Sequence, residues 1–99
     1  MTVCTGVIPV LRSGVLGQKT ATAPRLLIPG LEKEFPDVEF VEKRWWRDGK
    51  VWTSGGVTNG LDMMAAFCWG GFGAGEGGVV VETVLGMADV GERGQEYGD

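Results

Sequence analysis

A cysteine close to the start of the chain has the sequence setting of a nucleophile. The run Val3-Cys4-Thr5-Gly6 leads into Val7–Ser13, and Gly14 follows. We expect the end of a strand, a sharp turn that carries Cys4, and a short helix that stops at Gly14. In a nucleophile elbow, such a turn exposes one side chain, and the next backbone N–H faces an oxyanion. The pattern predicts Cys4 as a thiolate nucleophile stabilised by the helix start, Thr5 as the backbone oxyanion donor, and Gly6 as a residue that relieves crowding.

The same residues also have an ordinary structural explanation. Cysteine is among the most often buried residue types, so Cys4 can equally be a core residue beside a turn. The chain has no histidine, the commonest general base and metal ligand. The only other cysteine, Cys68, forms neither a metal-ligand spacing nor a disulfide framework with Cys4. We therefore expect neither a metal ion nor a cofactor.

Composition excludes several classes of protein. At 99 residues and 43% hydrophobic content, the chain is predicted to fold as one small domain. Its net charge is -4 and its basic residues are scattered, which argues against nucleic acid as a partner. No apolar run is long enough to span a membrane, and the first residues are not typical of a signal peptide. We expect a cytoplasmic protein without membrane contact.

The segments after the elbow read as short alternating strands and helices. Lys19–Thr22 suits a strand, 29–35 a helix, and the alternating run 37–42 a half-buried strand. Arg44–Thr53 is predicted to form a β-hairpin around Asp48-Gly49, because a type I′ turn favours that dipeptide.

The hairpin carries three tryptophans. A two-residue Asp48-Gly49 loop would place Trp45 directly opposite Trp52, and Trp46 opposite Val51. We expect Trp45, Trp46 and Trp52 to be exposed. They would cover a sheet edge or a partner surface, or alternatively stack on a base or sugar.

The second half is predicted to hold two helices. The first begins at Thr58 or Asn59, with Asn59 and Asp62 resembling a capping box. An apolar stripe follows, and Cys68 lies on it as a packing residue: Leu61, Met64, Ala65 and Cys68. Residues 70–78 read as a glycine-rich linker, whose formal G-x-G-x-x-G match we reject because it follows a helix. Residues 79–90 favour a second helix, and 91–99 a frayed polar tail.

Several of these segments together resemble the ThiJ/PfpI superfamily of class I glutamine amidotransferase-like proteins. The superfamily includes the parkinsonism-associated deglycase and isocyanide hydratases. The most specific segment runs from Arg47 through Asp48-Gly49 and Trp52-Thr53-Ser54 to Asp62. The others are Val3–Gly6, Ser13–Leu16, Ala21-Thr22 and Phe35–Val38. The resemblance covers residues 3 to about 69.

The resemblance implies a flavodoxin-like α/β sandwich with Cys4 as the family's reactive cysteine, and Thr5 and Gly6 shaping the oxyanion site. The family domain begins well before its cysteine, with strands that carry an acidic residue bonded to the thiol. Only three residues precede Cys4 here, and Ala23-Pro24-Arg25 stands where many members have a histidine. Residues 1–69 therefore read as the C-terminal half of such a domain, 70–78 as a linker, and 79–99 as a helix and tail.

Two functions follow as hypotheses. The first is a truncated domain that is not catalytic alone and serves as a redox-sensing or interaction module. A dimer mate or partner chain would then cover the exposed strands and tryptophans. The second is a cysteine-dependent hydrolase or lyase that acts on a small carbonyl, amide or isocyanide substrate.

Overall fold

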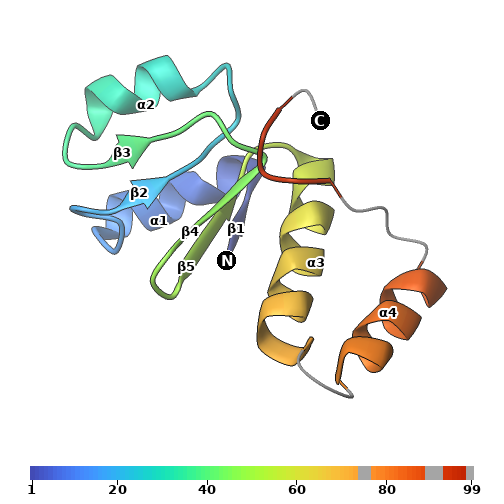
Figure 1. The fold of residues 1–99 in the computed structure, drawn as a ribbon. Helices are drawn as coiled ribbons and strands as arrows, with labels where there is room; N and C mark the ends of the chain where they lie inside the picture. Colours follow the sequence, from blue (N-terminus) through green and yellow to red (C-terminus); the bar gives the residue numbers. More distant parts are fainter. Residues whose placement is uncertain (74–76, 89–92, 98–99) are drawn as a thin grey trace.

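The computed structural model describes residues 1–73, 77–88 and 93–97, which form a small mixed α/β domain (Figure 1). A two-residue strand leads through one 3-10 turn into the first helix, as the sequence predicts. The elements in order are β1 (Thr2–Val3), η1 (Cys4–Gly6), α1 (Val7–Ser13), β2 (Thr20–Ala21), α2 (Ile28–Glu34), β3 (Glu39–Phe40), β4 (Trp45–Asp48), β5 (Val51–Ser54), α3 (Val57–Phe72) and α4 (Gly77–Met87).

The described strands form two small sheets. In the first, β5 is central, with β1 parallel on one side and β4 antiparallel on the other. In the second, β2 and β3 pair in parallel, with Ala21 beside Phe40. Thr22 connects the two sheets, because its N–H donates to the Thr53 hydroxyl at 2.9 Å and its side chain is fully buried. The sheets therefore act as one platform with α1 and α2 packed against it.

The hairpin forms, but its register differs by one residue from the prediction. Asp48 lies opposite Val51, so the two loop residues are Gly49 and Lys50. Gly49 has φ 61° and is the first central residue, as a type II′ turn requires. The preference of Asp-Gly for a type I′ turn suggested the wrong register. Trp45 therefore lies opposite Ser54, and it stacks on Trp52 as a diagonal neighbour with ring centroids 5.6 Å apart.

The tryptophans are less exposed than the sequence suggests. Trp52 is 9% exposed, and its ring meets Phe67 of α3 edge-on at 5.5 Å. Trp45 and Trp46 are half-buried. The residue before Trp52 in β5, Val51, points to the opposite face, where it packs on the cluster that contains Val7 of α1. The hairpin is thus covered on one face by α3 and on the other by the α1 side.

Helix α3 begins earlier and ends later than predicted. Its N-cap is Gly56 with no side-chain cap, so the expected capping box at Asn59 does not form. The helix continues through Gly70 and Gly71 to Phe72, and α4 begins at Gly77, so most of the described part of the predicted linker is helical. Residues 74–76 lie outside the described residues. The predicted helix over 79–90 is confirmed from Val79 to Met87, although it begins two residues earlier, at Gly77; residues 89 and 90 lie outside the described residues.

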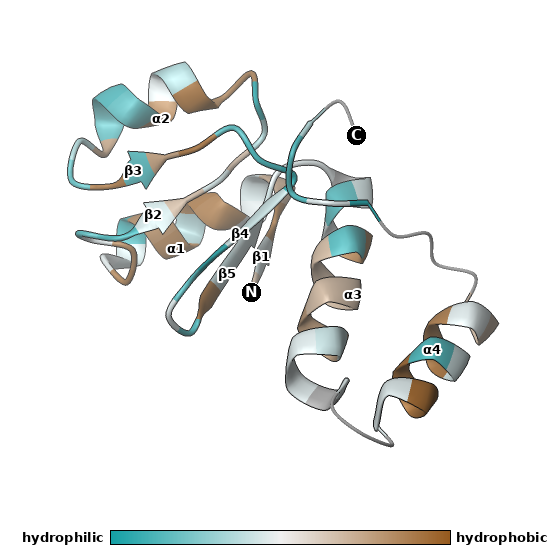
Figure 2. Ribbon diagram, in the orientation of Figure 1, coloured by the Kyte–Doolittle hydropathy of each residue, from teal (hydrophilic) through white to brown (hydrophobic). Residues whose placement is uncertain are grey.

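The last turns of α3 meet α4 in a second, smaller core. Ala65 packs with Val81 and Leu85, and half-buried Cys68 joins them, as predicted for a packing cysteine. A cavity of about 160 Å³ opens between the two helices. Hydrophobic residues recur along α4 (Figure 2), and Val79, Val80, Val84 and Met87 are exposed. The predicted stripe on α3 is wrong at Leu61 and Met64, which are exposed, whereas Met63 is buried.

Candidate functional site

The Cys4 turn has the backbone of a nucleophile elbow. Strand β1 ends at Val3, η1 starts at Cys4, and α1 follows directly at Val7. Cys4 has φ 53°, a left-handed conformation that costs a non-glycine residue on the order of 1–3 kcal/mol. The Val7 N–H donates to the carbonyls of Cys4 and Thr5, which tightens the turn. The thiol is half-buried.

Thr5 and Gly6 follow the elbow on its exposed side. Thr5 lies in the 3-10 turn directly after Cys4, the position required of a backbone oxyanion donor. The reason predicted for Gly6 is wrong. A Cβ there would meet nothing within 4 Å, and its φ of -58° and ψ of -17° suit any residue. Gly6 therefore relieves no crowding within the chain.

Cys4 lies at the carboxyl ends of the parallel strands. Val3 pairs with Ser54, so one step further along the two strands brings Cys4 and Gly55 to the same edge. In open α/β sheets, ligands bind at this edge. The first turns of α3 close over it, because a Cβ on Gly60 would lie 3.1 Å from the Val3 side chain. At this edge, the strained backbone of Cys4 lies near Gly55 and Gly60, whose lack of a side chain lets neighbouring segments approach closely.

The Cys4 thiol has no hydrogen-bond partner among the described residues. The Ala23-Pro24-Arg25 segment supplies a backbone carbonyl to this edge, since a Cβ on Gly55 would lie 3.2 Å from the Ala23 oxygen. In the described ranges, no three residues of the metal-ligating types cluster closely enough to hold a metal ion. Among the described residues no acid or base is hydrogen-bonded to the thiol, so the site offers a cysteine with a strained backbone at a helix start.

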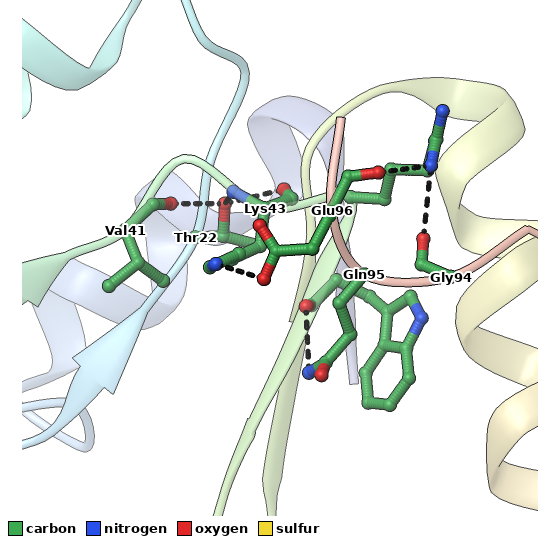
Figure 3. A network of polar contacts seen from close by, with 8 residues as sticks. Thr22, Val41, Lys43, Gly94, Gln95 and Glu96 are labelled. Atoms are coloured by element: carbon green, nitrogen blue, oxygen red, sulfur yellow. Dashed lines mark hydrogen bonds and ion pairs between the residues drawn. The ribbon is translucent and has the colours of Figure 1, made fainter. Parts of the chain in front are cut away.

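The sequence analysis missed the segment 93–97, which we call the strap. It was expected to be frayed, yet it lies along residues 43–45 at the same end of the molecule as the start of α3 (Figure 1). Figure 3 shows Gly94, Gln95 and Glu96 beside Lys43. The Arg44 N–H donates to the Gln95 carbonyl at 2.6 Å, and the Arg44 guanidinium donates to the carbonyls of Gly94 and Glu96.

Two further residues of the strap, Arg93 and Tyr97, contact the body of the domain. Arg93 donates to Asp62 through both its backbone N–H, at 3.0 Å, and its guanidinium, at 2.9 Å, and Asp62 is only 4% exposed. Tyr97 reaches the sheet edge, where its hydroxyl accepts a hydrogen bond from the Asn59 side chain at 3.1 Å. The Arg25 guanidinium stacks 4.3 Å from the centre of the Tyr97 ring. The signal available in the sequence was Asp62 on a predicted apolar helix, with no lysine or arginine within ten residues to pair with it.

Comparisons with known proteins add no assignment: no protein-family model matches the chain, and no curated protein matches its sequence. Among the described residues, none of the helices has both the length and the apolar character needed to cross a bilayer.

Proposed function

We propose that this chain is a ThiJ/PfpI-like domain of flavodoxin-like architecture in which Cys4 is a redox-sensing thiol. The observation that carries the proposal is the positive φ of Cys4 at a strand-to-helix turn. Strained non-glycine backbone concentrates at functional sites, because folding otherwise selects against it. A core cysteine beside a turn has no need of this conformation.

The segment that carries the family resemblance supports the same proposal. Gly55 and Gly60 of this segment lie where Tyr97, Ala23 and Val3 pack closely against the sheet edge. A Cβ on Gly55 would lie 2.7 Å from the Tyr97 hydroxyl, and one on Gly60 would press on Val3. Asp62, the last residue of the segment, holds Arg93. These residue types therefore have a physical reason at the Cys4 edge.

The chemistry of a sensing thiol needs only a thiolate and an accessible oxidant. The Cys4 sulfur attacks one oxygen of hydrogen peroxide, the O–O bond breaks, and hydroxide leaves to become water after it takes up a proton. The sulfur is oxidised to sulfenic acid, and the peroxide is reduced. One thiol condenses with the sulfenic acid to form a disulfide and release water, and a second thiol reduces that disulfide back to the Cys4 thiol. No histidine is required for either step.

A complete hydrolytic cycle makes larger demands. It needs a group that protonates the leaving atom and a base that activates water. The chain has no histidine, and no described carboxylate bonds the thiol. The interaction-module version is also less favoured, because Phe67 of α3 already packs on Trp52, and Trp45 stacks on Trp52. Redox sensing is the function that these groups support best.

A cysteine hydrolase or lyase remains the second candidate. The exposed position of Thr5 directly after the elbow favours it, because that backbone N–H is where an oxyanion would be stabilised. This candidate predicts turnover of methylglyoxal or a small isocyanide by the purified chain, and complete loss of turnover in Cys4→Ser. Turnover that survives Cys4→Ser would contradict it.

The redox proposal is tested by trapping sulfenic acid with dimedone during exposure to hydrogen peroxide. Mass spectrometry of the Cys4 and Cys68 peptides gives both rates in one sample, and Cys68, also half-buried, is the matched reference. We expect Cys4 to be labelled at least about tenfold faster, because it lies in a strained turn at the sheet edge, whereas Cys68 packs against the core of α4. Equal labelling of the two thiols would refute the proposal.

A further inference from the structure

The strap joins residues that are far apart in sequence and lies at the edge that holds Cys4. Four of its five residues make side-chain contacts with the body of the domain. Arg93 bonds Asp62, Gln95 donates to the Trp45 carbonyl at 3.4 Å, Glu96 pairs with Lys43, and Tyr97 accepts from Asn59. Gly94 contributes its carbonyl to Arg44. Contacts at every position, from both backbone and side chains, are typical of recognised peptide segments.

The contacts with the body are built on buried polar groups. Asp62 is 4% exposed and Arg44 is 5% exposed, both in a chain of modest size. Both carboxylate oxygens of Asp62 accept from Arg93, at 3.0 and 2.9 Å. A buried carboxylate is costly unless it is paired and hydrogen-bonded. The pairing of the buried Asp62 carboxylate with Arg93 therefore stabilises the strap in its observed position.

Tyr97 brings the strap to the edge itself. Its hydroxyl lies 2.7 Å from the point where Gly55 would carry a Cβ, closer than a side chain there would permit. Gly55 follows Ser54, and Ser54 pairs with Val3, the residue before Cys4. The Arg25 guanidinium stacks on the Tyr97 ring, 4.3 Å from its centre. An aromatic ring thus fills space that an α/β sheet ordinarily offers to a ligand.

We propose that the strap is a gate that closes the Cys4 edge, held by the Asp62–Arg93 pair and plugged by Tyr97. Release of the strap opens the edge and gives small electrophiles and oxidants faster access to the thiol. This inference rests on the proposed function in one respect, since it takes Cys4 as the functional thiol. It adds that the chain controls that thiol through its own distant segment.

The test measures the alkylation rate of Cys4 by iodoacetamide in the full chain, relative to Cys68 in the same sample. Asp62→Asn and Arg93→Gln each remove one side of the pair without changing the size of the side chain greatly. Arg12→Gln, an exposed cation on α1, is the matched control. We expect both strap variants to raise the Cys4-to-Cys68 ratio at least about fivefold, the double variant to add little, and the control to leave it unchanged.

Hydrogen exchange of the Arg44 N–H reports strap release independently, because its acceptor is the Gln95 carbonyl. Faster exchange at Arg44 with an unchanged Cys4 ratio would overturn the gate. Protection at Arg44 that persists in both variants would overturn it too, since Asp62 and Arg93 would then not hold the strap. The two proposals fail separately. A thiol that alkylates faster on release but gives no sulfenic acid would keep the gate and refute the redox function.

Discussion

At its first turns α3 meets the sheet edge and the strap, whereas its later turns pack against α4 and, through Phe67, against Trp52 of β5. The first end is polar, and its groups are paired: Asp62 holds Arg93, and Asn59 donates to Tyr97. The last end is apolar, with Ala65 and Cys68 against the small core of α4 beside a cavity of about 160 Å³.

The contrast separates specificity from burial. Hydrogen bonds fix direction and partner, so Asp62 and Asn59 at the polar end place Arg93 and Tyr97 of the strap individually. Apolar contact is not directional, and α4 leaves Val79, Val80 and Val84 exposed, two of them at the mouth of the cavity. Each end also holds one half-buried cysteine, Cys4 near the sheet edge and Cys68 beside α4. Comparing the two thiols therefore shows how the polar and apolar surroundings change thiol reactivity.

The largest expected difference concerns what anchors α3. Trp52 of β5 packs between Trp45 of β4 and Phe67 of α3. Trp52→Ala should therefore lower the free energy of unfolding by about 3–5 kcal/mol. Trp69, at the other end, is exposed by 38%, and Trp69→Ala should cost only about 1 kcal/mol. Urea denaturation followed by circular dichroism measures both. Equal losses would mean that the α4 end contributes as much as the sheet end.

The next effect tests whether α4 is a separate cooperative unit. Leu85→Ala should cost about 2 kcal/mol, because it removes a buried side chain from a small core. Val84→Ala, a neighbouring exposed residue, should change stability by less than about 0.5 kcal/mol. Hydrogen exchange should show protection lost from α4 and retained in β5. Loss of protection at Trp52 as well would show that α4 and the sheet unfold as one cooperative unit, which would contradict the prediction.

The smallest effect concerns the glycines around α1. Gly6 has a helical backbone and open space, so Gly6→Ala should stabilise the fold by about 0.5 kcal/mol. Gly14 has φ 83°, and Gly14→Ala should destabilise it by about 1 kcal/mol. Thermal denaturation gives the two signs. A loss of Cys4 labelling in Gly6→Ala, with the fold intact, would show that an incoming molecule needs the space there.

Local chemistry made the start of the chain predictable. A strand end, a cysteine turn and Gly14 as a left-handed stop are all short-range features, and each forms. The hairpin was likewise visible, but its register was not. A single positive φ at Gly49 distinguishes a type II′ from a type I′ turn, and Asp-Gly permits either placement of the glycine.

The strap was not predictable by such rules. Its residues are polar, so periodicity and propensity classify it as a tail. What orders it are partners about 30 to 50 residues away, including the carboxylate of Asp62 and the guanidinium of Arg44. Asn59 and Asp62 were interpreted as a local helix cap, although their side chains serve contacts that only the tertiary fold brings together.

The two-residue strand β1 has a consequence for the order of folding. The β4–β5 hairpin joins neighbouring residues and closes within microseconds in typical cases, whereas β1 pairs with residues about 50 positions away. The loop between them must close before Val3 reaches Ser54. The left-handed turn at Cys4 is therefore imposed late, when the first three residues dock. Until β1 pairs with β5, the backbone of Cys4 is not held in this turn, so the labelling rate of its thiol during refolding reports when that pairing forms.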